Sequence, residues 1–452
     1  MGRDLVVVGG GAAGLSAAGA GRRRGAAVTL INDGPLGGDC TFRGCVPSKT
    51  LLASARAGRD FVGAMADVAR VVEEVAATES AETLRALGVT VLEGRARFVG
   101  ARTLEVDGRA LAARRVVLCA GAGAARPPIP GLIGPRTVTN EDLFAIGRRP
   151  EHLVVLGGGP IGVEMAEAFS RLGSRVTVVE AAARLLPREE PEASAALTAL
   201  LTRLGVDVVT GHAASEVRHS EGVEVRLADG RAVTGDLLLV ALGRTPATAG
   251  LGLEAAGVAL ESSGHVRVDR RLRTTARGVY AAGDVATSLN LTHVAYEMGR
   301  VAALNALGPV AALRAHPEWA PAVTYGSLEV ARVGSTEAEV RDPSARVAFV
   351  PLGEVDRARA TGETDGFVKL IAVAAPLTRH RLGGRLVGAT IVAPRAGEMI
   401  AELALALRAG LYPARLALTA HPYPSWSVAI QQAAAQFFGE FAGRSARPSQ
   451  RE

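Results

Sequence analysis

The stretch DLVVVGGGAAG, residues 4–14, decides the fold of the first part of the chain. An apolar run of strand length, residues 5–8, leads into the pattern Gly9-x-Gly11-x-x-Gly14, and small residues suited to a packed helix follow. In this strand–turn–helix context the pattern is a dinucleotide-binding fingerprint. Gly9 permits the tight turn, Gly11 lets a diphosphate approach the backbone, and Gly14 lets the helix lie close to the strand. The start of the helix then offers unpaired N–H groups to the phosphates.

A second copy of the pattern begins about 150 residues later, in LVVLGGGPIG, residues 153–162. Here Gly157, Gly159 and Gly162 take the same three roles. One fingerprint alone is weak because glycine turns are common, but two copies, each followed by a helix and another strand, indicate two nucleotide-binding units. The sequence therefore predicts an α/β fold with two Rossmann-like dinucleotide-binding domains.

The residue that ends the second strand of each unit is expected to meet the ribose of the nucleotide. In the second unit this residue is Glu180, whose carboxylate can accept hydrogen bonds from both ribose hydroxyls and would repel a 2′-phosphate. The next arginine, Arg184, is four residues further on, so we favour NAD(H) over NADP(H). In the first unit the position holds Asn32, which binds a hydroxyl less strongly than a carboxylate does, and the neighbouring Asp33 is a second acceptor.

Two of the three cysteines lie five positions apart in GGDCTFRGCVPSK, residues 37–49. A metal site would need two further ligands, and no nearby His or Cys supplies them. Inert burial is the other alternative, and it suits Cys119, which ends an apolar run. Cys40 and Cys45 lie instead between a glycine turn and a helix expected to begin near Pro47. The helix dipole would lower a thiol pKa there, so a disulfide that closes this short loop is expected to be exchangeable.

The bulk composition narrows the class of protein. The chain has 452 residues, 48% of them hydrophobic and 54 of them glycine, which is typical of an α/β protein with many tight turns. No apolar run is long enough to span a bilayer, no leader pattern precedes the first strand, and three cysteines are too few for a disulfide framework. We therefore expect a cytoplasmic protein that binds no membrane. The net charge of +6 comes from scattered arginines, so we also expect no nucleic-acid partner.

Several segments together resemble one family. GGDCTFRGCVPSK resembles the redox-active segment of the class I flavoprotein disulfide reductases, also called class I pyridine nucleotide-disulfide oxidoreductases. This family includes dihydrolipoyl dehydrogenase, glutathione reductase and mercuric reductase. VVLCAGAGAARPPIPG resembles the family's crossover into the nicotinamide domain, LLLVALGRTP the return segment and GVYAAGDVA the second flavin motif. After residue 320, AVTYGSLEVARVGSTEAEV and GATIVAPRAGEMIAELALAL resemble the dimerisation domain, so the likeness covers nearly the whole chain in the family's order.

The resemblance implies a domain order as well as a fold. It implies a homodimer with one FAD per subunit and an α+β dimerisation domain at the C-terminal end. The first part of the FAD-binding domain would be residues 1–149, and the NAD(P)-binding domain residues 150–262. The second part of the FAD-binding and central domain would be residues 263–319, and the dimerisation domain residues 320–452.

The resemblance also implies roles for individual residues. Electrons would pass from NADH through FAD to a Cys40–Cys45 disulfide and then to a small-molecule disulfide or dithiol. Cys45 would be the thiolate beside the flavin, Cys40 the thiol that meets the substrate, and Lys49 a flavin-side charge paired with Glu164. Lys49 is one of only two lysines in an arginine-rich chain, which suggests a site that suits a compact ammonium. The positions implied for FAD are Gly9, Gly11, Gly14, Asn32, Asp33, Lys49, Gly121, Gly283 and Asp284, and those for NAD are Gly157, Gly159, Gly162, Glu180 and Gly243.

The C-terminal segment departs from the family pattern His-Pro-Thr-x-x-Glu, in which the histidine serves the partner subunit's thiol and the glutamate orients it. In AHPYPSWS the histidine is kept as His421, but Tyr423 and Trp426 take the Thr and Glu positions. No acidic residue lies between Glu402 and Glu440, so the dyad is either missing or built differently. We interpret His421 as catalytic, and the alternative is a packed interface histidine.

These observations predict an FAD-dependent NAD(P)H:disulfide oxidoreductase, most like dihydrolipoyl dehydrogenase. A reductase of quinones is one alternative, because Tyr423 and Trp426 suggest an aromatic substrate entrance. A metal-ion reductase similar to mercuric reductase is another, although the chain has no C-terminal cysteine pair. A third alternative is a redox-sensing partner subunit without enzymatic activity.

Overall fold

The structure is a computed structural model that describes residues 4–309 and 312–450. The chain divides into two compact units, each made from separate stretches of sequence. Unit 1 comprises Met1–Pro128, Thr137–Arg149 and Leu239–Pro317. Unit 2 comprises Ile129–Arg136, Pro150–Leu238 and Glu318–Glu452. Among the described helices, none is long and apolar enough to cross a membrane.

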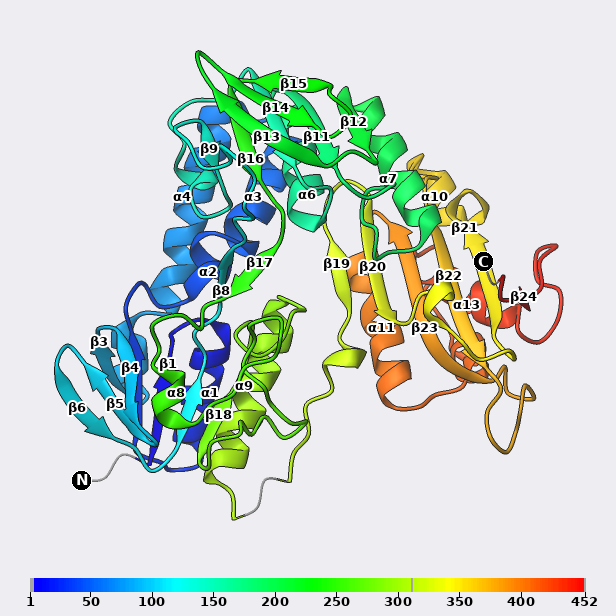
Figure 1. Ribbon diagram of the computed structural model, residues 1–452. Coiled ribbons are helices and arrows are strands. Elements are labelled where there is room, and N and C mark those ends of the chain that lie inside the picture. Colours follow the sequence, from blue (N-terminus) through cyan, green and yellow to red (C-terminus); the bar gives the residue numbers. More distant parts are fainter. Residues whose placement is uncertain (1–3, 310–311, 451–452) are drawn as a thin grey trace. The chain divides into compact units, whose positions relative to one another are not determined.

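Unit 1 is built on a parallel five-stranded sheet of order β18-β7-β1-β2-β3 (Figure 1). Its strands are β18 (Val279–Ala281), β7 (Val116–Leu118), β1 (Leu5–Val8), β2 (Val28–Asn32) and β3 (Thr90–Glu93). Every residue of β1 is buried, as expected for a central parallel strand that is covered on both faces. Helix α1 (Ala12–Arg23) joins β1 to β2. The first glycine pattern therefore lies in a β–α–β unit, as predicted.

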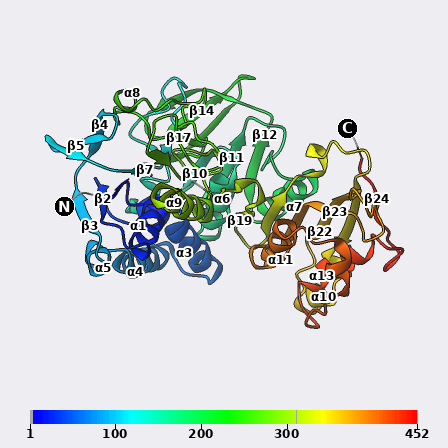
Figure 2. The same ribbon diagram turned by 90° about the horizontal axis from the view of Figure 1, so that it is seen from below.

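Helices α1 and α9 (Thr292–Leu307) pack side by side, and both views show this (Figures 1 and 2). Small residues permit the close approach: a Cβ on Gly299 would lie 2.0 Å from the backbone oxygen of Ala13. The other elements of unit 1 are α2 (Gly38–Phe42), α3 (Cys45–Arg56), α4 (Phe61–Thr78), α5 (Ala81–Ala86), β4 (Ala96–Gly100), β5 (Thr103–Val106), β6 (Arg109–Ala112), β8 (Ala122–Ala124), β9 (Thr137–Val138), η1 (Leu143–Ala145), β17 (Arg244–Pro246) and α8 (Leu253–Ala256).

Several helices begin where the sequence carries a start signal. The Asp60 side chain accepts the N–H of Gly63 at 2.8 Å and caps α4. Pro160 opens α6 (Pro160–Arg171) and Pro191 opens α7 (Pro191–Arg203), where a missing N–H costs nothing. These local signals fix where the connecting helices of both nucleotide units begin.

The nucleotide part of unit 2 repeats the arrangement of unit 1. Strands β10 (His152–Leu156), β11 (Arg175–Glu180) and β12 (Val206–Thr210) run parallel, with α6 between the first two and α7 between the last two. The second glycine pattern thus also lies in a β–α–β unit, which confirms the predicted pair of Rossmann-like folds. An antiparallel sheet and one further strand follow: β13 (Ala214–His219), β14 (Val223–Leu227), β15 (Ala232–Gly235) and β16 (Leu237–Val240).

The C-terminal part of unit 2 is an antiparallel sheet of order β19-β20-β23-β22-β21-β24, packed against helices. This confirms the α+β class expected for it, whereas the four domain boundaries remain predictions. All seven residues of β22 are buried, Lys369 among them. The elements are η2 (Pro317–Trp319), β19 (Ala322–Thr324), β20 (Glu329–Gly334), η3 (Glu337–Glu339), β21 (Arg346–Pro351), η4 (Leu352–Glu354), α10 (Asp356–Thr361), β22 (Phe367–Val373), β23 (Arg385–Ala393), α11 (Ala396–Arg408), α12 (Pro413–Leu418), α13 (Val428–Ala435) and β24 (Arg447–Pro448).

Candidate active site

The first glycine loop has the geometry of a diphosphate cradle. Gly9 has φ +104°, which favours glycine, and a Cβ on Gly14 would lie 1.8 Å from the Gly9 oxygen. Gly11 caps α1, and the nearest atom to a Cβ added there would be the Cα of Gly38, at 3.9 Å. The loop therefore presents open backbone at a helix N-terminus, which fits the diphosphate of FAD.

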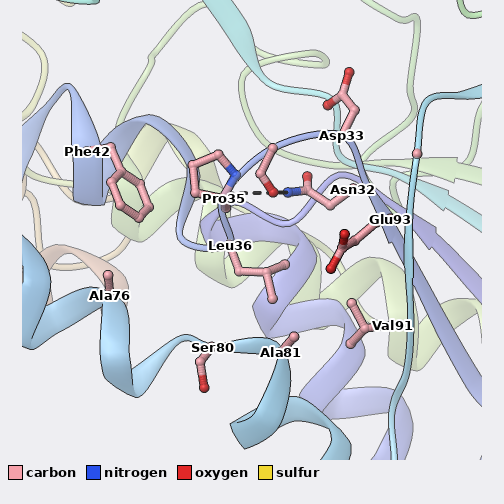
Figure 3. A pocket seen from close by; sticks show the side chains of 12 residues that line it. Asn32, Asp33, Pro35, Leu36, Phe42, Ala76, Ser80, Ala81, Val91 and Glu93 are labelled. Atoms are coloured by element: carbon pink, nitrogen blue, oxygen red, sulfur yellow. Dashed lines mark hydrogen bonds between the residues drawn. The ribbon is translucent and has the colours of Figure 1, made fainter.

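Asn32 organises this loop. Its Oδ1 accepts the N–H of Gly10 at 2.8 Å, and its Nδ2 donates to the Gly34 oxygen at 2.6 Å. Beside it lies a cavity of about 480 Å³, which starts at the carboxyl ends of β2 and β3. Figure 3 shows Asp33 and Glu93 near Asn32 on one side of this cavity, away from Phe42. A cavity at the end of the second strand is where the adenosine part of a dinucleotide is expected.

The redox segment joins two short helices. Cys40 lies in α2, and Cys45 is the first residue of α3, two residues before the start that Pro47 suggested. Both cysteines are free thiols, and Cys45 Sγ lies 3.3 Å from Oγ1 of Thr292, the first residue of α9. Thr292 was not among the predicted site residues because it is far away in sequence and only the fold brings it here.

The two thiols are electrostatically unequal. A hydrogen bond from Cys40 lowers the pKa of Cys45 to about 5, assisted by Thr292 and the charge of Lys49 and opposed by burial. The same thiol–thiol hydrogen bond, followed by burial and the nearby carboxylate of Glu79, raises the pKa of Cys40. These opposite pKa shifts favour the thiolate on Cys45, at the α3 N-terminus, and the thiol on Cys40, as the resemblance implied, and the two roles remain predictions.

Asp284, one of the positions implied for FAD, lies close enough to Cys45 for the two charges to interact. Burial raises the pKa of its carboxyl, Asp39 and Cys45 raise it further, and the Arg244 guanidinium opposes them. Asp39 and Arg244 were both missed by sequence reasoning, because no local pattern marks two residues that meet only after folding. They form an ion pair with each other.

The three glycines predicted at the nucleotide sites outside the two glycine loops adopt left-handed backbone conformations. Gly121 has φ +75° and Gly243 has φ +110°, and a Cβ on either would meet no atom within 4 Å. Gly283 has φ +77°, and its Cβ would lie 3.0 Å from Cβ of Ala13 in α1. Glycine is favoured at all three positions for the backbone alone, and its role toward a cofactor remains a prediction.

The second glycine loop is held by Glu180 in the way that Asn32 holds the first. Its Oε2 accepts the N–H of Gly158 at 2.6 Å and its Oε1 accepts the N–H of Ala182 at 2.7 Å. Arg184 donates to the main-chain oxygens of Glu189 at 2.8 Å and Pro187 at 2.9 Å. Its guanidinium is thus already engaged with backbone, while the Glu180 carboxylate has lone pairs to spare.

Glu164, in α6, is 4% exposed and accepts the N–H of Tyr325 at 3.1 Å. One turn later on the same helix, Glu167 accepts the backbone N–H of Ser327 at 3.0 Å and its hydroxyl as well. The turn between β19 and β20 is therefore attached to the nucleotide part of unit 2. Lys49 belongs to unit 1, and its pairing with Glu164 remains a prediction.

His421 has a carboxylate partner after all. Its Nε2 lies 3.1 Å from Oε1 and 3.2 Å from Oε2 of Glu402 in α11, and its Nδ1 lies 2.9 Å from the Thr419 oxygen. The side chain of His421 is only 5% exposed. The expected alternative of a missing dyad is wrong in this respect: the carboxylate comes from a preceding helix, which the α11–α12 connection folds back onto the histidine.

The two aromatic residues of this segment differ in environment. Tyr423 is 74% exposed and donates its hydroxyl to Asp356 at 2.8 Å. Trp426 is partly buried and packs against the hydrophobic core of the C-terminal sheet. Of the two, Tyr423 is thus the more accessible to an acceptor. Within the described residues, no group of three or more His, Cys, Asp or Glu side chains could hold a metal ion.

The comparisons with known proteins agree with this geometry. Residues 3–299 match the pyridine nucleotide-disulphide oxidoreductase family, and residues 320–434 match the dimerisation domain of the same family. A mercuric reductase from Bacillus cereus is 33% identical over 96% of this chain and 71% of its own length. A dihydrolipoyl dehydrogenase from Thermus scotoductus is 34% identical over 95% of this chain and 96% of its own.

Solved structures similar to this chain belong to the same class of enzyme, the flavoprotein disulfide reductases. The HOCl-induced flavoprotein disulfide reductase of Escherichia coli, solved as a cysteine-to-serine mutant in complex with Cu(II), superposes with a TM-score of 0.88 at 30% identity. The match covers 96% of this chain and 99% of that one. With two glycine loops, a cysteine pair and a C-terminal dimerisation domain in the family's order, this chain belongs to the FAD- and NAD(P)-dependent pyridine nucleotide-disulphide oxidoreductases.

Proposed function

We propose that this oxidoreductase is an NADH:disulfide reductase, most like dihydrolipoyl dehydrogenase, that acts on a small-molecule disulfide or dithiol. The observation that carries the proposal is the inequality of Cys40 and Cys45, because two thiols of opposite pKa shift suit a two-step exchange. We take the protein to act in the cytoplasm, and as a homodimer, which its dimerisation domain supports.

Cys45 and Cys40 have separate roles in the proposed disulfide reduction. Bound FAD would accept hydride from the nicotinamide and deliver two electrons to the Cys40–Cys45 disulfide. Breaking that bond with two electrons and one proton leaves a thiolate on Cys45, favoured by α3 and Lys49, and a thiol on Cys40.

The exchange with substrate follows from Cys40. Once deprotonated, it attacks one sulfur of the acceptor disulfide and the other sulfur leaves, so that a mixed disulfide forms. The Cys45 thiolate then attacks Cys40, restores the internal disulfide and releases the second substrate thiol. We assign proton transfer at the partner subunit's Cys40 and at the leaving sulfur to His421. In this role Nε2 would stay on Glu402, and Nδ1 would exchange the Thr419 oxygen for the sulfur.

The preference for NADH rests on the second glycine loop. The Glu180 carboxylate ends the second strand of the unit, where a 2′-phosphate is expected to arrive, and the nearest arginine along the chain, Arg184, donates to backbone oxygens. A carboxylate whose nearest arginine along the chain is already engaged disfavours NADPH.

Reduction of a metal ion is a second candidate function. Several relatives carry the name mercuric reductase, and two similar solved structures are Cu(II) complexes. A pair of free thiols could bind a soft metal ion as substrate. Quinone reduction is supported only by the exposed aromatic ring of Tyr423.

Two experiments decide among these functions. In an anaerobic NADH titration followed by visible absorbance, the proposal expects a thiolate-to-flavin absorption band at the two-electron stage. Steady-state rates with lipoamide, glutathione disulfide, Hg(II), Cu(II) and a quinone then rank the acceptors. Turnover of quinone alone, unaffected by Cys40→Ala, would remove the disulfide proposal.

A further inference from the structure

Arg244 is a nearly buried cation whose role the family assignment leaves open. It is the first residue of β17, which pairs antiparallel with β8. Its side chain is 12% exposed, and its guanidinium donates to the carboxylate of Asp39 and to the backbone oxygen of Ala122. A nearly buried guanidinium is costly without partners, so its arrangement indicates a specific requirement for positive charge.

Asp39 explains that requirement. It follows Gly37 and Gly38, which lie against the first glycine loop: the Gly37 N–H donates to the Gly10 oxygen at 2.8 Å, and a Cβ on Gly38 would lie 2.9 Å from Cα of Gly11. Asp39 also directly precedes Cys40 in the sequence. The chain thus carries a carboxylate between the loop that suits a diphosphate and the redox pair.

A second carboxylate lies on the other side of the same guanidinium. Nε of Arg244 is 3.9 Å from Oδ2 of Asp284, too far for a hydrogen bond. That Nε is buried and has no hydrogen-bond partner among residues 4–309 and 312–450. Within the same residues, Asp39 and Asp284 pair with no cationic side chain other than Arg244. Arg244 therefore compensates both carboxylates, and one of its donors is still unused.

We propose that Arg244 is the positioning residue that neutralises Asp39 and so allows the first nucleotide site to take a diphosphate beside a carboxylate. The inference rests on FAD binding, which the proposed function also requires, but not on the identity of the acceptor. Removing Arg244 would leave Asp39 uncompensated next to the incoming phosphates. Removing Asp39 as well would remove the reason for the cation.

The test is a double-mutant cycle on FAD affinity. Apoproteins of wild type, Arg244→Met, Asp39→Asn and the double variant are titrated with FAD, and binding is followed by the change in flavin fluorescence. We expect Arg244→Met to weaken FAD binding by about 10- to 100-fold, the cost of one uncompensated charge. Asp39→Asn should bind FAD at least as tightly as wild type, and the double variant should recover most of the loss.

Arg231→Met is the matched control, because Arg231 is an exposed arginine paired with Asp229 in unit 2. Its FAD affinity should equal that of wild type. Far-UV circular dichroism checks that each apoprotein is folded. If Arg244→Met does not fold, the milder Arg244→Gln and its double with Asp39→Asn carry the same comparison.

Two outcomes of the double-mutant cycle would contradict the proposal. A double variant that binds FAD as weakly as Arg244→Met would overturn the proposal, since Arg244 would then act through its bond to Ala122 or by filling space. So would an Asp39→Asn variant that loses as much affinity as Arg244→Met. Failure of the proposed function would look different: wild type would bind FAD and reduce no disulfide, and the cycle would be unaffected.

Discussion

Nε2 of His421 lies 3.1 Å from a carboxylate oxygen of Glu402, although Glu402 lies in α11 and His421 in the segment after α12. Nδ1 of the same ring faces the main-chain oxygen of Thr419. Both partners are acceptors, so the ring donates to whichever of them faces its N–H. The ring is therefore held between the Glu402 carboxylate and a main-chain carbonyl, which fixes its orientation.

The variant Glu402→Gln should lower kcat with a disulfide acceptor roughly 10- to 100-fold, because it removes the charge that orients and compensates the acid–base group. The rate of flavin reduction by NADH should be unchanged, since that half of the reaction does not use His421. Stopped-flow absorbance separates the two. Glu398→Gln, at an exposed position one turn earlier on α11, is the control. An equal loss in both variants would contradict the role of Glu402.

The thiolate-to-flavin band should report the hydrogen bond between the cysteines. In the two-electron-reduced wild type it should persist at neutral pH and fade near pH 5, because Cys45 is a thiolate only above its pKa of about 5. Cys40→Ala removes the largest cause of that low pKa, so the band should fade at a higher pH. Cys119→Ala, which alters a buried cysteine away from the pair, should leave the midpoint in place. An unchanged midpoint in Cys40→Ala would show that the low pKa of Cys45 has another cause.

Glu180→Gln should reduce the discrimination between the nicotinamide cofactors. Removing the carboxylate charge is expected to lower the ratio of kcat/KM for NADH over NADPH by about tenfold, mainly through better use of NADPH. Asp207→Asn, on the neighbouring strand β12, is the control and should leave the ratio as it is. An unchanged ratio in Glu180→Gln would show that the selectivity lies outside this loop.

Lys369 should be essential for stability. Its side chain is 2% exposed, and its ammonium lies 3.0 Å from Glu190, 2.9 Å from Glu192 and 2.8 Å from Glu337. Lys369→Met would leave these carboxylates without their shared cation and should lower the free energy of unfolding by about 3–5 kcal/mol. Urea unfolding measures this. The exposed ion pair removed by Arg231→Met should cost no more than about 1 kcal/mol.

The same cluster should make the protein sensitive to acid. Burial raises the pKa of Glu337, but hydrogen bonds from Arg447 and Lys369 outweigh it and hold the pKa to about 2. Its contribution is complete above the ordinary pKa of 4.5 and is lost as the pH falls from there toward 2, about 3 kcal/mol in all. Thermal midpoints across this range should fall steeply in wild type and less steeply in Glu337→Gln. Parallel curves would assign the acid sensitivity to other groups.

Distance along the chain explains which features could be predicted from the sequence and which could not. The glycine loops and the cysteine pair are each contained in about a dozen residues, so their local pattern was enough to predict the fold and the redox pair. Thr292, Arg244 and Glu402 were missed, because each meets its partner only through packing of segments far apart or through a helix that folds back. The expectation for Glu402 also assumed the family's spacing, which this chain does not keep.

The scarcity of lysine has a practical consequence. Lys369 is enclosed in β22, whereas Lys49 is half-buried beside the redox segment, and the sequence contains no other lysine. Of the two lysines, Lys49 is therefore the less enclosed target for an amine-directed acylating reagent. A fluorophore or isotopic tag on Lys49 would lie within four residues of Cys45. Mass spectrometry or optical spectroscopy could then report on the redox site without an introduced labelling residue.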